Sequence, residues 1–285
     1  MTYSTPGRSR SQFNRTTLSI ASALVVIVTA LALVLNALPG SAAASNPAAP
    51  KPTIVLVHGA FADASSWSGP IRRLQHLGYT VTAPPNPLRG LLTDAESLRT
   101  FLSTISGPVV LVGHSYGGAV ITNAATGNPN VKALVYIAAY APDQGETLGE
   151  AGALGGGTST LPQNLIVRPF PGAPPDDGDG SINPAAFRAV FAQDVPAEQA
   201  AVMAATQRPI ALSAFGTPSG TPAWKTIPSW ALVATEDHAI PAQAERAMAK
   251  RAHAKTVEIH SSHAALVSHP GAVTSLILAA AMARP

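Results

Sequence analysis

A serine at residue 115 lies in the sequence G-H-S-Y-G-G (residues 113–118), between an apolar run at 108–112 and a small-residue run at 116–125. The apolar run predicts a strand buried on both faces, and the run that follows predicts a helix. A G-x-S-x-G sequence between a strand and a helix is typical of a nucleophile held in a tight, strained turn with small neighbours. We therefore interpret Ser115 as a candidate nucleophile. An ordinary glycine-rich turn without a chemical role is the alternative.

The chain from residue 53 onward alternates short apolar runs with segments of helical spacing. We expect further strands at residues 53–57, 79–83, 131–138, 230–234 and 256–260, and helices at 65–78, 93–105, 241–252 and 271–283. Strands that alternate with helices predict a mostly parallel central sheet with helices on both faces, which is an α/β fold.

This alternation stops between residues 146 and 222. Glycine and proline clusters at 155–157 and 174–178 predict loops, and residues 184–192 and 196–205 predict short helices. We interpret the segment at about 146–222 as a helical cap inserted between the fourth and fifth strands.

The N-terminal segment precedes this domain and has a different composition. Residues 1–17 are polar and basic, residues 18–38 are almost wholly apolar, and an alanine-rich stretch follows at 41–44. This order predicts a signal peptide (1–44) cleaved near Ala44, or else an uncleaved N-terminal anchor, since about 20 apolar residues can span a bilayer. We expect residues 45–52 to form a linker, residues 53–285 to form the domain, and the domain to be secreted or otherwise extracytoplasmic. Membrane contact is expected only if the leader stays attached.

The composition excludes several classes of site. The chain has no cysteine, so disulfides, thiolate metal sites and a cysteine nucleophile are excluded. Charged residues make up 12%, against about 25% in typical domains, which argues against a disordered or coiled-coil protein. Without the leader, 15 basic residues balance 15 acidic ones, so a nucleic-acid partner is not expected. His58, His114 and His238 lack a known zinc spacing, and no metal is expected.

A serine nucleophile needs a base, and the base needs an orienting carboxylate. In enzymes with a serine in such a strand–helix turn, the acid follows the serine in the chain and the histidine comes last. Asp237 and Glu236 both follow the strand at 230–234, and we favour Asp237. Asp143, which follows the strand at 131–138, is the alternative acid.

The base is expected in the loop after the last strand. His263 occupies this loop in the sequence Ser261-Ser262-His263, and we interpret it as the base. His260, still in the strand, and His269, before the final helix, are the alternatives.

Acyl transfer also needs two backbone donors for the tetrahedral oxygen. We expect one to be the amide of Tyr116, directly after the nucleophile, and the other to lie in the loop after the first strand. Ala60 is our choice there, with its neighbour Phe61 as the alternative.

With these motifs in hand, the chain resembles the α/β-hydrolase superfamily from about residue 51 to the C-terminus. Within it, the sequence is similar to the branch that holds plant methylesterases, hydroxynitrile lyases and many bacterial esterases. The motifs that carry the resemblance are H-G-A-F at 58–61 with Trp67, G-H-S-Y-G-G at 113–118, A-T-E-D at 234–237 and S-H-A at 262–264. The lyases of this branch carry a lysine where this chain has Ala264 and a threonine where it has Gly59, so the resemblance implies an esterase.

The sequence therefore predicts an exported serine hydrolase that cleaves small to medium carboxylic esters through Ser115, His263 and Asp237, without a cofactor. Phe61 and Trp224 are expected to contact substrate. Further candidate lining residues in or near the cap are Phe187, Phe191, Met203, Ile210 and Phe215. A hydroxynitrile lyase, a cofactor-free perhydrolase, an amidase or lactonase, and a catalytically silent binding protein are the alternatives.

Overall fold

The computed structural model describes residues 1–2 and 50–283. The expected signal peptide and the linker up to residue 49 lie outside these described residues. The chain divides into two compact units, and the unit from Pro50 to Pro285 is the domain described below. Among the described residues, every helix is too short or too polar to cross a membrane.

A six-stranded sheet forms the centre of the domain, and all its strand pairs are parallel. Its strands, in spatial order, are β2 (Val81–Thr82), β1 (Thr53–Val57), β3 (Val109–Ser115), β4 (Val131–Ala139), β8 (Ser229–Ala234) and β9 (Lys255–Ile259). This confirms the expected parallel sheet. Val57 pairs with Gly113, and Gly113 pairs with Tyr136, so the carboxyl ends of β1, β3 and β4 meet at one edge.

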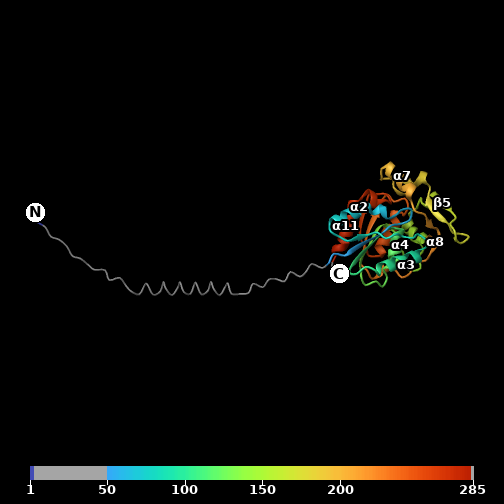
Figure 1. Ribbon diagram of the computed structural model, residues 1–285. Coiled ribbons are helices and arrows are strands. Elements are labelled where there is room, and N and C mark those ends of the chain that lie inside the picture. Colours follow the sequence, from blue (N-terminus) through green and yellow to red (C-terminus); the bar gives the residue numbers. More distant parts are fainter. Residues whose placement is uncertain (3–49, 284–285) are drawn as a thin grey trace. The chain divides into compact units, whose positions relative to one another are not determined.

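Helices cover both faces of the sheet (Figure 1). One face packs against α2 (Ser68–His76) and α11 (Pro270–Met282), and the other against α3 (Leu91–Leu102), α4 (Tyr116–Ala124) and α9 (Ala242–Arg251). Alternate residues of the strands supply the two cores, as the two-residue period of a strand requires. In β1, Ile54 and Leu56 face α2 and α11, whereas Val55 and Val57 face the other layer.

The segment inserted between β4 and β8 contains more than helices. Its elements are α5 (Leu148–Gly152), β5 (Leu165–Arg168), β6 (Asp179–Ile182), α6 (Pro184–Phe191), α7 (Ala197–Thr206), β7 (Ile210–Ala211) and α8 (Ser213–Gly216). The helices α6 and α7 lie where the sequence predicts them. The cap also contains the antiparallel sheet β5-β6-β7, which the sequence analysis did not predict. Its strands are two to four residues long, too short for an alternating pattern to stand out.

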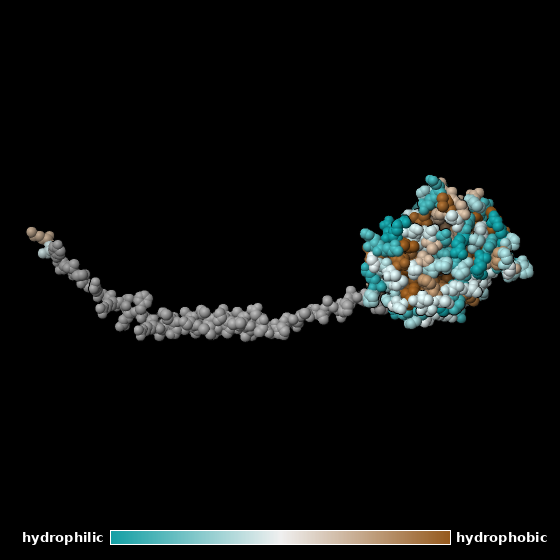
Figure 2. Space-filling view, in the orientation of Figure 1, coloured by the Kyte–Doolittle hydropathy of each residue, from teal (hydrophilic) through white to brown (hydrophobic). Residues whose placement is uncertain are grey.

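The connections contain short helical turns, namely η1 (Ala64–Trp67), η2 (Leu154–Gly156), η3 (Pro162–Asn164), η4 (Ala223–Lys225) and α10 (Ala265–Ser268). Large apolar side chains that stay exposed on the domain belong to separate elements, among them Leu92 of α3, Val202 of α7 and Val257 of β9. On the face shown in Figure 2, hydrophobic residues lie interspersed with hydrophilic ones. Single exposed apolar residues of this kind are ordinary for a folded domain.

Candidate active site

Ser115 lies at the end of β3 and is the N-cap of α4, with φ 53° and ψ −126°. A positive φ is uncommon for a residue with a side chain, and such strain clusters at functional sites. The turn is tight enough that a β-carbon on Gly117 would lie 2.5 Å from the carbonyl oxygen of Val57. The strained serine and its small neighbour are what the G-x-S-x-G sequence predicts.

Gly59, in the loop after β1, lies directly against the serine. A β-carbon at this position would lie 2.6 Å from Cβ and 3.1 Å from Oγ of Ser115. The loop can therefore run beside the serine only because residue 59 has no side chain. This close approach brings the neighbouring amides of the loop to Ser115.

His263 and Asp237 form a buried hydrogen-bonded pair, in which His263 Nδ1 lies 2.5 Å from Asp237 Oδ2. The exposed fractions of the two side chains are 1% and 0%. The second oxygen of Asp237 accepts the amides of Ala239 at 2.7 Å and Ile240 at 2.8 Å. With Nδ1 donating to the carboxylate, Nε2 of His263 is the nitrogen that can accept a proton.

Ser115 and His263 line the same enclosed cavity of about 10 Å³, together with Ala60 and Tyr116. The structure therefore brings the predicted nucleophile, base and both amide donors to one place. Within the described part of the chain, no hydrogen bond joins Ser115 Oγ to His263. Such contacts are often long in unliganded enzymes and shorten when substrate binds.

The two loop amides after Gly59 differ in their partners. The amide of Phe61 donates to the carbonyl of Arg208 at 3.0 Å, whereas the amide of Ala60 has no acceptor among the described residues. Tyr116 is the first residue of α4, and the first amides of a helix have no partner within it. Ala60 and Tyr116, the two amide donors proposed from the sequence, thus both border the cavity of Ser115.

Two histidines brace the loops around the site. His114 Nε2 lies 2.9 Å from the carbonyl of His263, and burial lowers the pKa of His114 well below its ordinary value. His58 Nδ1 lies 2.9 Å from the carbonyl of Gly59, and His58 Nε2 accepts the amide of Asn86 at 3.0 Å. Burial also lowers the pKa of His58, which favours the neutral form of both rings.

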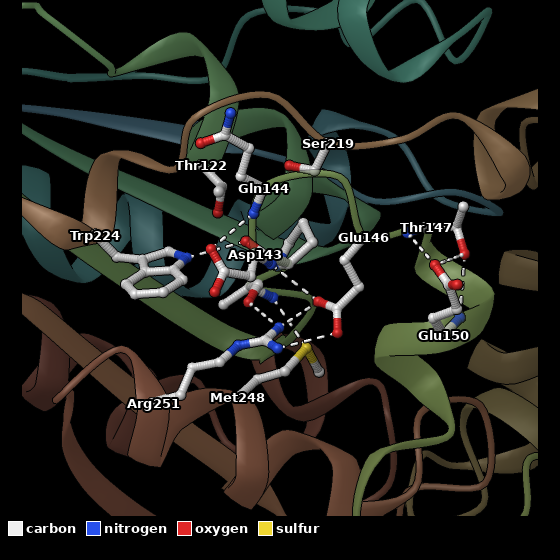
Figure 3. Close-up of polar contacts among 12 residues, drawn as sticks. Thr122, Asp143, Gln144, Glu146, Thr147, Glu150, Ser219, Trp224, Met248 and Arg251 are labelled. Atoms are coloured by element: carbon white, nitrogen blue, oxygen red, sulfur yellow. Dashed lines mark hydrogen bonds and ion pairs between the residues drawn. The ribbon is translucent and has the colours of Figure 1, made fainter.

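The rival acid Asp143 lies away from this pair. It forms an ion pair with Lys225 at 2.7 Å, and its side chain is 39% exposed. In Figure 3 it lies beside Trp224, Arg251 and Glu146, and these polar residues hold the loop after β4.

The rival bases His260 and His269 also lie outside the pair. His260 is exposed and lies 3.7 Å from Glu236, and His269 lies 3.6 Å from Asp194. The contact with Asp237 thus distinguishes His263 from the other two histidines, and Asp237 from Glu236.

The two expected substrate-contacting residues have different positions. Phe61 lines the cavity of Ser115 and packs edge-on against Phe191, with ring centroids 6.5 Å apart. Trp224 borders neither this cavity nor the larger one described next, among the residues that the structure describes. Its indole donates to the carbonyl of Pro142 at 3.1 Å (Figure 3). The Lys225 ammonium and the Arg251 guanidinium lie over its ring, 5.4 and 6.0 Å from the centroid.

A larger apolar cavity of about 470 Å³ adjoins the site. It shares Tyr140, Leu161, Phe215 and Ala239 with the cavity of Ser115. Its wall comes mainly from the inserted segment, including α5 and the loop that follows it, and contains Leu148, Leu165 and Leu212. Pockets that hold small organic ligands span about 300–1,000 Å³ and are mostly apolar. Of the remaining candidate lining residues, Phe191 borders the cavity of Ser115, Phe187 packs on Phe191, Met203 lies at another cavity, and Ile210 is buried in β7.

Three buried or half-buried carboxyl groups near the site were not expected. Asp94, in the first turn of α3, accepts the hydroxyl of Tyr116 at 2.7 Å. Glu245, in the first turn of α9, lies beside Asp237. Asp194, between α6 and α7, accepts the amide of Ser262 at 3.0 Å. In the sequence, an acid in the first turn of a helix or a loop is typical of a solvated group, so no local signal marks these residues.

No group of three or more histidine or carboxylate side chains is placed to hold a metal ion within the residues that the structure describes. The arrangement groups a serine, a histidine–carboxylate pair and two backbone amides around one cavity, and such a set of groups suits acyl transfer.

Comparison with known proteins agrees with this class of site. The chain matches the model of the alpha/beta hydrolase family over residues 54–276, and it belongs to that family. It is 30% identical over 257 residues to the alpha/beta hydrolase nvfD of Aspergillus novofumigatus (strain IBT 16806), a match that covers 81% of this chain and 97% of the relative. It is also 34% identical over 107 residues to a carbendazim hydrolyzing esterase of Nocardioides sp. (strain SG-4G), over 33% of this chain and 44% of that protein.

Among solved structures, the methylesterase protein MES16 from Arabidopsis has the same fold, with a TM-score of 0.67 and 19% identity. That match covers 80% of this chain and 98% of the methylesterase. The family model and the match to nvfD thus identify the chain as an alpha/beta hydrolase, and the methylesterase shares its fold.

Proposed function

We propose that the protein is an exported serine esterase that cleaves small to medium carboxylic esters through an acyl-enzyme. The observation that carries the proposal is the hydrogen bond of 2.5 Å between His263 and Asp237, in a site where His263 and Ser115 border one cavity.

Each group has a separate role in the proposed reaction. Ser115 Oγ attacks the ester carbonyl while His263 Nε2 takes its proton, and His263 then passes that proton to the leaving alcohol. Asp237 holds the imidazole in the required tautomer and stabilises the imidazolium. The amides of Ala60 and Tyr116 donate to the oxyanion, and each such donor typically contributes about 10²–10³ in turnover. Water activated by His263 then attacks the acyl-enzyme and releases the acid.

The apolar cavity of about 470 Å³ supports a substrate with one apolar group of small to medium size. This group would lie between α5 and α8, and the ester carbonyl would enter the small cavity past Leu161 and Phe215. A small-molecule ester is therefore the proposed partner.

Export is proposed from the sequence of residues 1–44, which has the order of a signal peptide. Measuring the N-terminal sequence of the protein recovered from the culture medium of a secreting host tests this part. Cleavage near Ala44 supports export, and an intact leader in the membrane fraction supports the anchor instead.

Esterase activity is tested with residues 45–285 and p-nitrophenyl esters from acetate to palmitate. We expect the highest kcat/KM for short or medium acyl chains, and loss of activity in Ser115→Ala. Ser275→Ala is the matched control, because Ser275 is exposed on α11 and bonds only to its own helix at the carbonyl of Gly271. Equal activity of Ser115→Ala and the unchanged protein would contradict the proposal.

A further inference from the structure

Glu245 is a buried carboxyl group that the proposed reaction does not use. It lies in the first turn of α9 and is 3% exposed. Its Oε2 accepts the amide of Ala234, at the end of β8, at 3.1 Å. Its other oxygen, Oε1, is also buried and has no donor among the described residues. The carboxyl group lies within hydrogen-bonding reach of Asp237, the carboxylate that holds His263.

Two carboxyl groups in contact within a protein interior do not both ionise, because the like charges repel and neither is solvated. The number of donors decides which of the two keeps the charge. Asp237 accepts three hydrogen bonds, from Ala239, Ile240 and His263. Glu245 accepts one, from Ala234. The negative charge therefore resides on Asp237 and the proton on Glu245.

We infer that Glu245 is a neutral carboxylic acid whose Oε1–H donates to Asp237, which makes Glu245 a positioning residue for the His263–Asp237 pair. This inference rests on the proposed function only for its catalytic consequence, since the shared proton is a property of the folded protein. The bond satisfies the otherwise unpartnered Oε1 and helps to hold the Asp237 carboxylate in place.

The groups that face Glu245 fit this assignment. Asp237 lies beside it in the loop after β8, and His263 is bonded to the same Asp237. Tyr140, directly after β4, has its pKa raised by burial and then by the neighbouring carboxyl groups of Asp237 and Glu245. The charged neighbour on its own helix, Arg246, is exposed and hydrogen-bonded to Glu258 at 2.7 and 2.9 Å. Burial, followed by the charge of Asp237, raises the pKa of Glu245 well above its ordinary value.

The pH dependence of stability tests the proton directly. A group whose pKa is raised in the folded state contributes stability that is fully present below its unfolded pKa, about 4.3, and is lost as the pH rises through the folded value. We compare the urea concentration at the unfolding midpoint in the unchanged protein and in Glu245→Gln. As the pH rises from about 5 to 9, we expect this midpoint to fall further in the unchanged protein than in Glu245→Gln. Glu236→Gln is the matched control, because Glu236 is exposed and precedes Asp237 directly. A gap between the protein and Glu245→Gln that stays constant over this range would overturn the inference.

A second comparison separates the contact with Asp237 from burial alone. A cavity of about 10 Å³ borders Glu245 near Met248, which is room for about one water molecule. If Asp237 is the partner, the pH-dependent gap shrinks when Glu245→Gln is introduced into an Asp237→Asn background. An equal gap in both backgrounds would mean that burial or water binds the proton, and would overturn the assignment. This measurement uses a variant without the triad carboxylate, so its outcome is independent of esterase activity.

The positioning role is tested by kinetics on p-nitrophenyl acetate. Glutamine keeps a donor at this place and leucine does not, so we expect kcat of Glu245→Leu to fall about tenfold or more below that of Glu245→Gln, with KM little changed. Equal kcat values in the two variants would contradict the positioning role. If Ser115→Ala keeps full activity, the proposed function is wrong. The inference about the proton on Glu245 is then still decided by the stability measurements alone.

Discussion

The hydroxyl of Tyr116 donates a hydrogen bond of 2.7 Å to Asp94, a carboxylate buried at the start of α3. Tyr116 is also the residue whose amide is proposed to bind the oxyanion. Asp94 also accepts the amide of Arg89 at 3.1 Å. Burial raises the pKa of Asp94, although these hydrogen bonds act to lower it. One residue thus links the first turn of α4, next to the nucleophile, to the neighbouring helix α3.

Removing this hydroxyl tests the role of the Tyr116 side chain separately from that of its backbone amide. Tyr116→Phe leaves a buried carboxylate with one donor fewer, and we expect the free energy of unfolding to fall by about 1–3 kcal/mol. Because the backbone amide remains, kcat should fall by less than tenfold. Urea unfolding and ester kinetics on the same preparation measure both quantities. A fall in kcat of more than tenfold would mean that the hydroxyl itself takes part in the reaction.

Gly59 sets the distance between the β1 loop and the nucleophile. In Gly59→Ala the new β-carbon would meet Cβ of Ser115 at 2.6 Å, so the loop or the serine must shift. A misplacement of about 1 Å in a reacting group can cost about 10²-fold in rate, and we expect a fall in kcat of this order. Gly271→Ala is the control, because a β-carbon there meets nothing within 4 Å. Unchanged kcat in Gly59→Ala would show that the loop is not held against Ser115.

The triad acid can be tested against its rival. Asp237→Asn should lower kcat by about 10⁴-fold, as the loss of the orienting carboxylate does in other serine enzymes. Asp143→Asn breaks the ion pair with Lys225, a half-exposed contact, and should change kcat by less than threefold. Steady-state ester hydrolysis measures both. The opposite ranking would assign the acid to Asp143.

The residues shared by the two cavities should set the acyl-chain preference. Phe215→Ala removes a half-buried ring that borders both cavities, and we expect kcat/KM to shift towards longer acyl chains. Trp224→Phe should leave the ranking of the p-nitrophenyl esters as it is, since Trp224 borders neither cavity. If Trp224→Phe instead changes the ranking of the esters, this would support the sequence-based expectation that Trp224 contacts substrate.

Asp194 connects the cap to the loop that carries His263. Partial burial acts to raise its pKa, but hydrogen bonds from Ser262, Ser268 and Ser261 outweigh this and hold the pKa below its ordinary value. A carboxyl group whose pKa is lowered in the folded state stabilises the fold at pH values above its unfolded pKa, about 3.9. This stability is lost as the pH falls through the folded pKa. We expect the stability gap between the protein and Asp194→Asn to shrink as the pH falls from about 5 to 3. A gap that widens on acidification would show that Asp194 is not held ionised.

Local sequence patterns predict those parts of the fold that are set by short apolar runs and turn residues. The strand ending at Ser115 and the loop containing His263 occur where the apolar runs and turn residues place them. The register of the parallel strands then brings Gly59 and Ser115 together, as the chain order of the motifs implies.

Other features depend on packing between distant segments, which no local pattern records. The cap sheet forms because β6 pairs with β5 and β7, although each strand is short and weakly patterned. Trp224 borders neither of the two cavities described above, and the sequence could not show this, because an aromatic residue near a cap suits a pocket wall as well as a contact with Lys225 and Arg251. Glu245 is near Asp237 only because α9 packs on β8.

The central claim is that Ser115 becomes acylated with His263 as its base. The most direct measurement is labelling of residues 45–285 with a serine-directed phosphonate ester, followed by peptide mass spectrometry. The account predicts one adduct, on the peptide that contains Ser115, absent in Ser115→Ala and formed at least 10²-fold more slowly in His263→Ala. Ester hydrolysis by a protein that stays unlabelled, or an adduct on another serine, would contradict it.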